Sequence, residues 1–133
     1  MFRVLALVAL AFLSGCGAQS CPGEAGQPMR IYTLYFGRAV TGRAEVSEKE
    51  WREFRDQIVT PALPAGYTVQ DGTGAWINPK ARSTISESTK ILTAALPDSA
   101  DSLGFINRVR GAYQKRFHQY VVGMTVQSGC GSF

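Results

Sequence analysis

Hydrophobic and polar positions follow two periodicities along the chain, one typical of β-strands and one typical of α-helices. Met29–Phe36 is aromatic and β-branched with apolar residues on both alternating faces, which predicts a central β-strand. Ser47 and Glu50 then form a capping box that predicts the start of a helix. We expect this helix to end at Thr60, because Pro61 disfavours helical geometry in the residue before it. Its apolar face recurs at helical spacing: Trp51, Phe54 and Ile58.

The middle of the chain predicts two further strands. Tyr67–Gln70 alternates as a strand, and Ala75–Ile77 resumes it. Between them, Gly72 and Gly74 suggest a bulge or bend. The next strand runs from about Ile85 to Leu96.

A second helix and a last strand complete the pattern. Pro97–Asp101 opens the helix, and Gln119–Val126 forms the strand, with Tyr120 on the same side as the apolar positions after it. The helix is expected to bury one face: Leu103, Ile106, Val109, Tyr113 and Phe117.

The order strand, helix, strand, strand, helix, strand is typical of an α+β, ferredoxin-like βαββαβ sandwich. In that fold two helices pack on one face of a four-stranded antiparallel sheet. We assign this single domain to residues 29–133. Its first and last strands are expected to be antiparallel neighbours, so the start of the first lies beside the end of the last.

The N-terminus has the pattern of an export signal. Arg3 precedes ten apolar residues, Val4–Leu13, which indicates a signal peptide over residues 1–15. The run is too short to cross a bilayer, which needs about 20 residues. The sequence Leu-Ser-Gly-Cys ending at Cys16 is similar to bacterial lipoprotein signals, so we expect lipidation of Cys16, with palmitate-type acyl chains. The alternative is an ordinary secreted protein with an incidental cysteine.

This pattern predicts a location. The chain is expected to be exported and lipid-anchored to the cell envelope, and its partners then include the membrane that holds the lipid. The outer membrane on its periplasmic side is favoured, because Gly17 stands where an aspartate commonly retains lipoproteins at the inner membrane. Residues 16–28, rich in Gly, Pro, Ser and Gln, are interpreted as a lipidated tether.

The cysteines follow from the same pattern. With Cys16 carrying lipid, Cys21 and Cys130 remain in an oxidising compartment, where a disulfide is the default. The bond would close a loop of about 100 residues, worth roughly 4.7 kcal/mol by chain entropy. The predicted topology brings the two cysteines together. Five peptide steps, about 17 Å of chain, would then separate the lipid from the bond.

Length and charge narrow the class of protein. Without residues 1–15 the chain has 118 residues, enough for one domain, and its 13 Lys and Arg against 10 Asp and Glu give a net charge of +3. An excess this small, outside the cytoplasm, favours weak attraction to anionic lipid headgroups, and we expect no nucleic-acid partner.

The chain also resembles a family: bacterial envelope proteins grouped as domain-of-unknown-function family 3574. The resemblance spans nearly all of residues 31–133 and implies no specific activity. The chain departs from the family pattern at Leu63, where phenylalanine is usual, and at Tyr120 and Val121, where a polar or acidic residue and serine are common. The matching residues are Leu34, Tyr35, Phe36, Gly37, Arg38, Val46, Ser47, Trp51, Thr60, Pro61, Gly66, Thr68, Val69, Gly74, Trp76, Glu87, Ser88, Lys90, Tyr113, Phe117, Gln119, Cys130 and Phe133.

Catalytic chemistry has little support in the sequence. His118 is the sole histidine, so neither a His-rich metal site nor a triad with a second histidine can be assembled, and we expect no metal and no cofactor. After a helix, a lone histidine more often caps carbonyls. Glu87 and Lys90 point to opposite faces of a strand, where an ion pair or solvated charge is the simpler interpretation. An enzyme with Glu87 or His118 as acid or base is the alternative hypothesis.

The favoured hypothesis is a binding or protein-interaction module. A sheet with helices on one face leaves the other open, and some of its aromatic residues should be uncovered there: Tyr32, Tyr35, Phe36, Trp76 and Tyr120. The candidate binding residues are Tyr35, Arg38, Trp76 and Glu87. Arg38 suggests a small anionic ligand. A second copy of the chain or another envelope protein would cover the face equally well.

Overall fold

The computed structural model describes residues 20–78 and 80–133. The predicted signal peptide and the predicted lipidation site at Cys16 lie outside these residues. The elements in chain order are η1 (Gly23–Ala25), β1 (Gln27–Gly37), α1 (Glu48–Phe54), the π-helical turn η2 (Arg55–Val59), α2 (Thr60–Ala62), β2 (Thr68–Asn78), β3 (Ser83–Pro97), α3 (Ala100–Phe117) and β4 (Gly123–Gly131).

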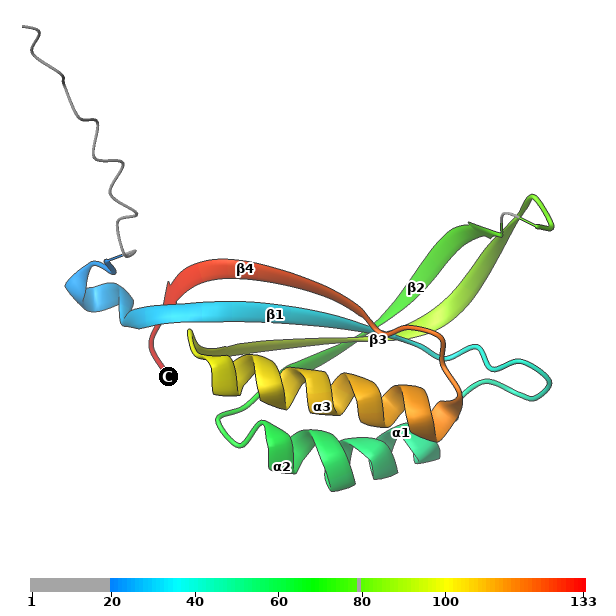
Figure 1. The fold of residues 1–133 in the computed structure, drawn as a ribbon, viewed down its shortest axis with the longest axis horizontal. Coiled ribbons are helices and arrows are strands. Elements are labelled where there is room, and N and C mark those ends of the chain that lie inside the picture. Colours follow the sequence, from blue (N-terminus) through cyan, green and yellow to red (C-terminus); the bar gives the residue numbers. More distant parts are fainter. Residues whose placement is uncertain (1–19, 79) are drawn as a thin grey trace, which may run out of the picture.

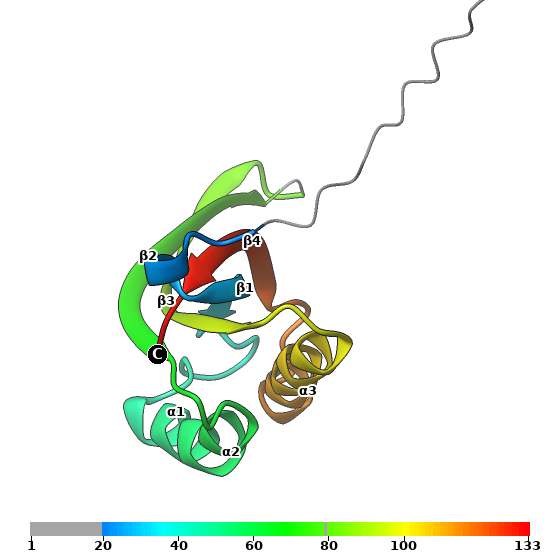
Figure 2. The same cartoon turned by 90° about the vertical axis from the view of Figure 1, so that its left-hand side faces the viewer.

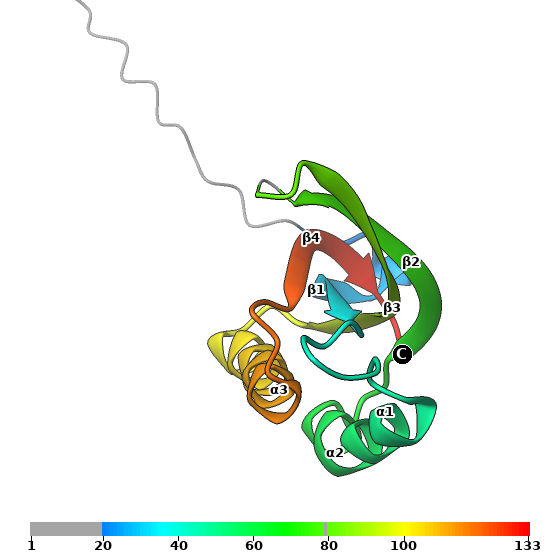
Figure 3. The same cartoon turned by 90° about the vertical axis from the view of Figure 1, so that its right-hand side faces the viewer.

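The sheet confirms the predicted α+β, ferredoxin-like architecture. Its strand order is β2-β3-β1-β4, and each neighbouring pair is antiparallel. The continuous helix α1–α2 and the helix α3 lie side by side on one face of the sheet (Figures 1 and 2). Among the described residues, no α-helix covers the other face (Figure 3). We call these the helix face and the open face.

The core lies between the helices and the helix face of β1 and β3. Tyr113 of α3 stands at its centre, with ring centroids 4.8 Å from Phe36 of β1 and 5.1 Å from Phe54 of α1. Both contacts are edge-to-face, a geometry that adds about 0.5–1.5 kcal/mol per pair beyond the burial of apolar area. The remaining fully buried large side chains are Leu34, Leu63, Leu92, Ile106, Val46, Val59, Val109 and Val122.

The first helix begins as predicted and ends later. Ser47 and Glu50 form the capping box. The helix continues through Pro61 to Ala62 rather than ending at Thr60. A π turn just before the proline explains this. The N–H of Thr60 donates to the carbonyl of Arg55, five residues back, so the hydrogen-bonding pattern of the helix is already shifted by one residue when the chain reaches Pro61. The same shift makes Val59, rather than Ile58, the fully buried residue.

Two further expectations are corrected, and a third is narrowed. Of the bulge or bend expected in β2, the described residues show no bulge, because the pairing with β3 stays one-to-one from Thr68 to Asn78, and the outer part of the hairpin bends instead (Figure 1). Leu103 of α3 is 41% exposed, and Ser102 is buried in its place, where its hydroxyl donates to the carbonyl of Pro97 at 2.7 Å. Tyr120 lies in the connection before β4 rather than in a strand, and is 98% exposed.

Side chains of α3 hold that last connection in place. Arg110 donates twice to the carbonyl of Val122, and Gln114 donates to the carbonyl of Tyr120. These bonds hold the connection against α3, and the strand begins at Gly123.

The predicted disulfide is present. Cys21 and Cys130 are bonded, with a Cα–Cα distance of 5.7 Å, across 109 residues of sequence. Pro28 of β1 pairs directly with Cys130 of β4, so the topology brings the cysteines together as expected. In the described part of the predicted tether, the chain folds into η1 and the start of β1.

Candidate functional site

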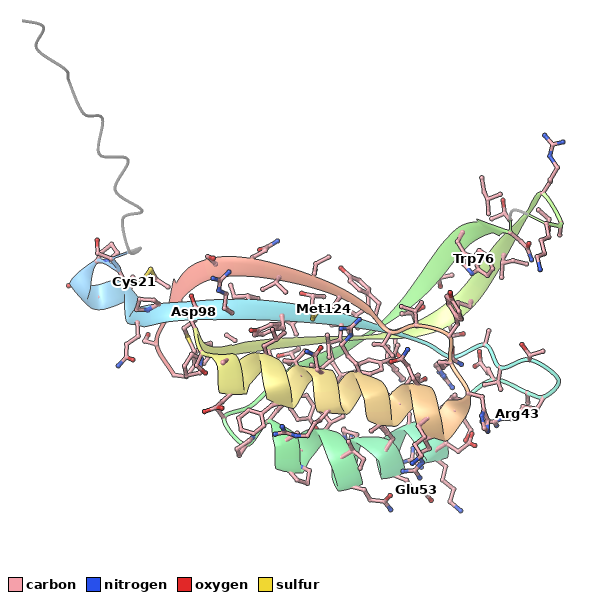
Figure 4. The ribbon with its side chains drawn as sticks, viewed as in Figure 1. Cys21, Arg43, Glu53, Trp76, Asp98 and Met124 are labelled. Atoms are coloured by element: carbon pink, nitrogen blue, oxygen red, sulfur yellow. A yellow bond between two sulfur atoms is a disulfide. The ribbon has the colours of Figure 1, made fainter. Side chains whose placement is uncertain are left out.

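The open face is hollowed at one end. A cavity of about 840 Å³ lies where β1 ends, and it falls within the ~300–1,000 Å³ typical of ligand sites. Its walls come from four segments: the end of β1, the loop that follows it, the outer part of the β2–β3 hairpin, and the connection from α3 to β4. That part of the hairpin bends away from the helices and carries Trp76, at the opposite end of the molecule from Cys21 (Figures 1 and 4).

Glycines create much of the hollow. Gly37, Gly74 and Gly123 line it, and each comes from a different strand. A Cβ on Gly74 would lie 3.1 Å from the hydroxyl of Thr89, and one on Gly37 would lie 2.7–2.9 Å from the carboxylate of Glu87. The glycines that the sequence suggested as a bulge therefore leave room for neighbouring side chains on a regular strand.

Glu87 carries the carboxylate of the cavity. The side chain is half-buried, rests over Gly37, and accepts a hydrogen bond from the backbone N–H of Ala39 at 3.1 Å. Among the described residues no Lys or Arg forms an ion pair with it, and no Lys or Arg lines the cavity. The carboxylate is positioned by the fold and unmatched by a cation of the chain.

Aromatic residues line the same cavity as this carboxylate. Tyr35 is 38% and Trp76 is 49% exposed, and both line the cavity with Tyr120. The other two aromatic residues considered for the open face, Tyr32 and Phe36, are buried under the helices. Strand alternation explains this division. Tyr35 lies on the opposite face of β1 from Tyr32 and Phe36, so it points away from the helices while they point toward them.

His118 also reaches the cavity. It ends α3 in a left-handed conformation, with φ of 53°, and its backbone N–H donates to the carbonyl of Gln114. The cap is therefore made by the backbone, while the exposed imidazole lines the cavity. His118 and Glu87, the two candidates for acid or base chemistry, thus line one hollow.

Arg38 lies on the helix face and does not line the cavity. Its Nε donates to the carbonyl of Val46 at 2.6 Å, and its guanidinium contacts the carboxylates of Glu48 at 2.7 Å and Glu45 at 3.3 Å. The side chain is buried, so these contacts hold the loop after β1 against the start of α1. The structure brings together three of the four predicted binding residues and separates Arg38 from them.

Lys90 completes the charge network of the helix face. Its ammonium group is buried between the carboxylates of Asp71 and Glu48, the latter at 2.9 Å. The hydrogen bond from Lys90 lowers the pKa of Glu48. Burial by itself lowers the pKa of Lys90, but the bonds to Asp71 and Glu48 outweigh it and raise that pKa overall.

Sequence reasoning missed the backbone contributions to the site. The N–H of Ala39 positions Glu87, and Gln119 donates to the carbonyl of Ala39 at 2.7 Å, which ties the two loops at the cavity together. One feature of the sequence could have predicted this arrangement. Gly37 is a glycine at the end of a central strand, and a glycine there indicates that another group approaches the backbone closely. Across residues 20–78 and 80–133, no group of His, Cys, Asp and Glu gathers to hold a metal, and no helix is long and apolar enough to cross a membrane.

Comparison with known proteins identifies the family and the fold. Residues 31–133 match the family described as "Protein of unknown function (DUF3574)", and the chain belongs to it. No curated protein sequence matches the chain. A phage SAM lyase in complex with S-methyl-5′-thioadenosine is similar in structure, with a TM-score of 0.60 and 11% identity over 74% of this chain and 80% of that one. The apo phage SAM lyase is similar with a TM-score of 0.57 and 13% identity, over 87% of this chain and 92% of that one. At these identities the likeness shows a shared fold.

Proposed function

We propose that this member of the DUF3574 family is a lipid-anchored envelope protein that binds a small ligand in the cavity of its open face. The observation that supports ligand binding is the convergence of Tyr35, Trp76 and Glu87 on one glycine-floored hollow. A concave site with aromatic walls and one positioned polar group is the usual form of a small-molecule site.

The disulfide, five residues after the proposed anchor in the sequence, and the cavity lie at opposite ends of the domain. β1 runs from beside the disulfide to the cavity, and its eleven residues span about 35 Å. A lipid on Cys16 would hold the disulfide end close to the membrane, because about 17 Å of chain separates Cys16 from Cys21. The cavity would then face away from the bilayer, open to soluble ligands of the periplasm.

The anchor is tested by intact-mass analysis of native, non-reduced protein. The expected mass is that of a chain starting at Cys16 with a diacylglycerol and an amide-linked acyl chain, less two hydrogens for the disulfide. A chain that keeps residues 1–15, or one that lacks acyl groups, would contradict lipid anchoring. A Cys16→Ser variant, released from the membrane fraction, is the matched control.

Ligand binding is tested by a fragment screen on the full chain with ¹⁵N-labelled tryptophan. The indole of Trp76 lines the cavity, while that of Trp51 is buried in the core and serves as internal reference. Binding fragments should shift the Trp76 signal selectively, and Tyr35→Ala should weaken them. Fragments that shift neither signal, across a screen that includes cations, anions and neutral rings, would argue against a small-ligand site. S-methyl-5′-thioadenosine belongs in that screen because the similar phage enzyme holds it.

Association with a second copy is a second candidate. The outer part of the β2–β3 hairpin exposes apolar groups on both sides, with Trp76 toward the cavity and Ile77, 71% exposed, on the opposite side. A two-stranded hairpin alone is marginally stable, so cover from a partner would stabilise it. Sedimentation of detergent-solubilised protein should show an oligomer that Ile77→Ser dissociates. A monomer at all concentrations would exclude this candidate.

Catalysis is the remaining alternative, and it is favoured by the position of Glu87 and His118 on the same cavity. If the protein turns over its ligand, His118→Ala and Glu87→Gln should abolish turnover while the fold is kept. Turnover that survives both substitutions would end the acid–base hypothesis.

A further inference from the structure

We propose that the ligand of this cavity is a small organic cation, held with its charge against the Glu87 carboxylate and its carbon substituents against Tyr35 and Trp76. The inference rests on the proposed ligand site and adds the chemical class of the ligand. Two properties of the site support it: an unmatched carboxylate and aromatic walls.

The carboxylate is unmatched although the chain has a net positive charge. Seven of the ten Asp and Glu residues form ion pairs, and Glu87 is one of the three that do not within the described residues. The other two, Glu24 and Asp101, are exposed on the surface, whereas Glu87 is half-buried in a cavity. A partly desolvated carboxylate with one hydrogen-bond donor keeps accepting capacity that a bound cation would satisfy.

The carboxylate is also held in place before any ligand arrives. Ala39 donates to Oε2, and the absence of a Cβ at Gly37 lets the carboxylate rest directly on the strand. A preorganised carboxylate loses little side-chain entropy on binding. The arrangement selects a cation or a strong hydrogen-bond donor over an anion, because Glu87 repels an anion and no Lys or Arg lines the cavity.

The aromatic walls favour an alkylated or ring-bearing cation over a metal ion. The π-faces of Tyr and Trp attract cations, and a cation with carbon substituents gains this attraction together with apolar contact. Gly37, Gly74 and Gly123 line the cavity without adding side chains to it, and the space beside them is taken by Glu87, Thr89 and Tyr35.

The test uses a cation and its neutral isostere, choline and 3,3-dimethyl-1-butanol, titrated into the full chain while the Trp76 indole signal is followed. We expect choline to bind about tenfold more tightly than the alcohol, with an affinity that falls as salt is raised. Glu87→Gln should remove this preference and leave binding of the alcohol unchanged. The glutamine carbonyl can still accept from Ala39, so the variant keeps the local fold.

Glu24→Gln is the matched control, because Glu24 is also without an ion pair and lies at the other end of the molecule; it should leave both titrations unchanged. Equal affinities for the two probes in the parent protein, or a preference for choline that is unchanged in Glu87→Gln, would overturn the cation proposal. If neutral or anionic fragments shift Trp76 while choline does not, the cation class alone is wrong. If no fragment shifts Trp76, the ligand site itself is wrong as well.

Discussion

The two faces of the sheet differ, at the same end of the molecule, in whether their charged side chains form ion pairs. On the helix face, Lys90 of β3 pairs across the strands with Asp71 and reaches Glu48 of α1. Three residues earlier on the same strand, Glu87 points to the open face, and its one hydrogen-bond partner within the described residues is the backbone N–H of Ala39. Lys90 on the helix face is therefore ion-paired within the fold, whereas Glu87 on the open face forms no ion pair among the described residues.

This difference separates structural charges from candidate functional ones. A buried cation must be compensated where it lies, so the network around Lys90 is a condition of packing the helices on the sheet. An unmatched carboxylate in a cavity contributes little to folding, and it is available to a ligand. The two kinds of site alternate along one strand because successive side chains point to opposite faces.

The largest effect is expected from Arg38, which the comparison places among the structural charges. Arg38→Met removes hydrogen bonds to Val46 and Glu48 and an ion pair with Glu45, and it should lower the free energy of unfolding by about 2–3 kcal/mol. Urea unfolding measures this, and the exposed Arg52→Met should stay within about 0.5 kcal/mol of the parent. Arg38→Met should leave cavity binding intact. Loss of ligand binding in a folded Arg38→Met protein would break the separation of the two faces.

A paired substitution tests the comparison more directly. Glu48→Gln should cost about 1–2 kcal/mol, less than a fully buried pair because the Glu48 side chain is half exposed, whereas Glu87→Gln should change stability by less than about 0.5 kcal/mol. The pKa of Glu48 is lowered in the folded state, so its contribution is present above its ordinary pKa of about 4.3 and is lost as pH falls through the folded value. The gap between Glu48→Gln and parent should therefore close in acid. An equal cost for both substitutions would show that the two carboxylates have the same role.

The fold was predictable because its signals are local or repetitive. The capping box, the helical apolar spacing and the strand order each point to the βαββαβ arrangement. The errors arose where tertiary contacts override local preference. A π turn carries the helix through Pro61, and hydrogen bonds from α3 keep Tyr120 out of the sheet.

The site was predictable only in part. Tyr35, Trp76 and Glu87 share the open face by strand alternation and register, which the pattern of the sequence contains. Arg38 follows β1 directly and its backbone N–H still donates to the carbonyl of Ser88 of β3, so strand alternation places it on the helix face, where its guanidinium contacts Val46 and Glu48. The prediction grouped Arg38 with Tyr35 at the end of the strand without applying the alternation that separates them. The hydrogen bond from Ala39 is a backbone contact and leaves no trace in side-chain chemistry.

The smallest effect concerns Tyr113, which joins the two faces. Its buried ring packs in the helix-side core, and its hydroxyl donates to the carbonyl of Gly37 at 3.0 Å, the residue on which Glu87 rests. Tyr113→Phe should lower stability by about 1 kcal/mol at neutral pH through loss of this hydrogen bond. Burial raises the pKa of Tyr113, so the unfolded chain loses this proton first, and the contribution of the hydroxyl is complete below pH ~10 and declines above it. Urea unfolding from pH 7 to 11 should show the difference between parent and Tyr113→Phe shrinking above pH ~10. A difference that stays constant over that range would mean that the hydroxyl is not sequestered, and that the boundary between the two faces is open to water at Gly37.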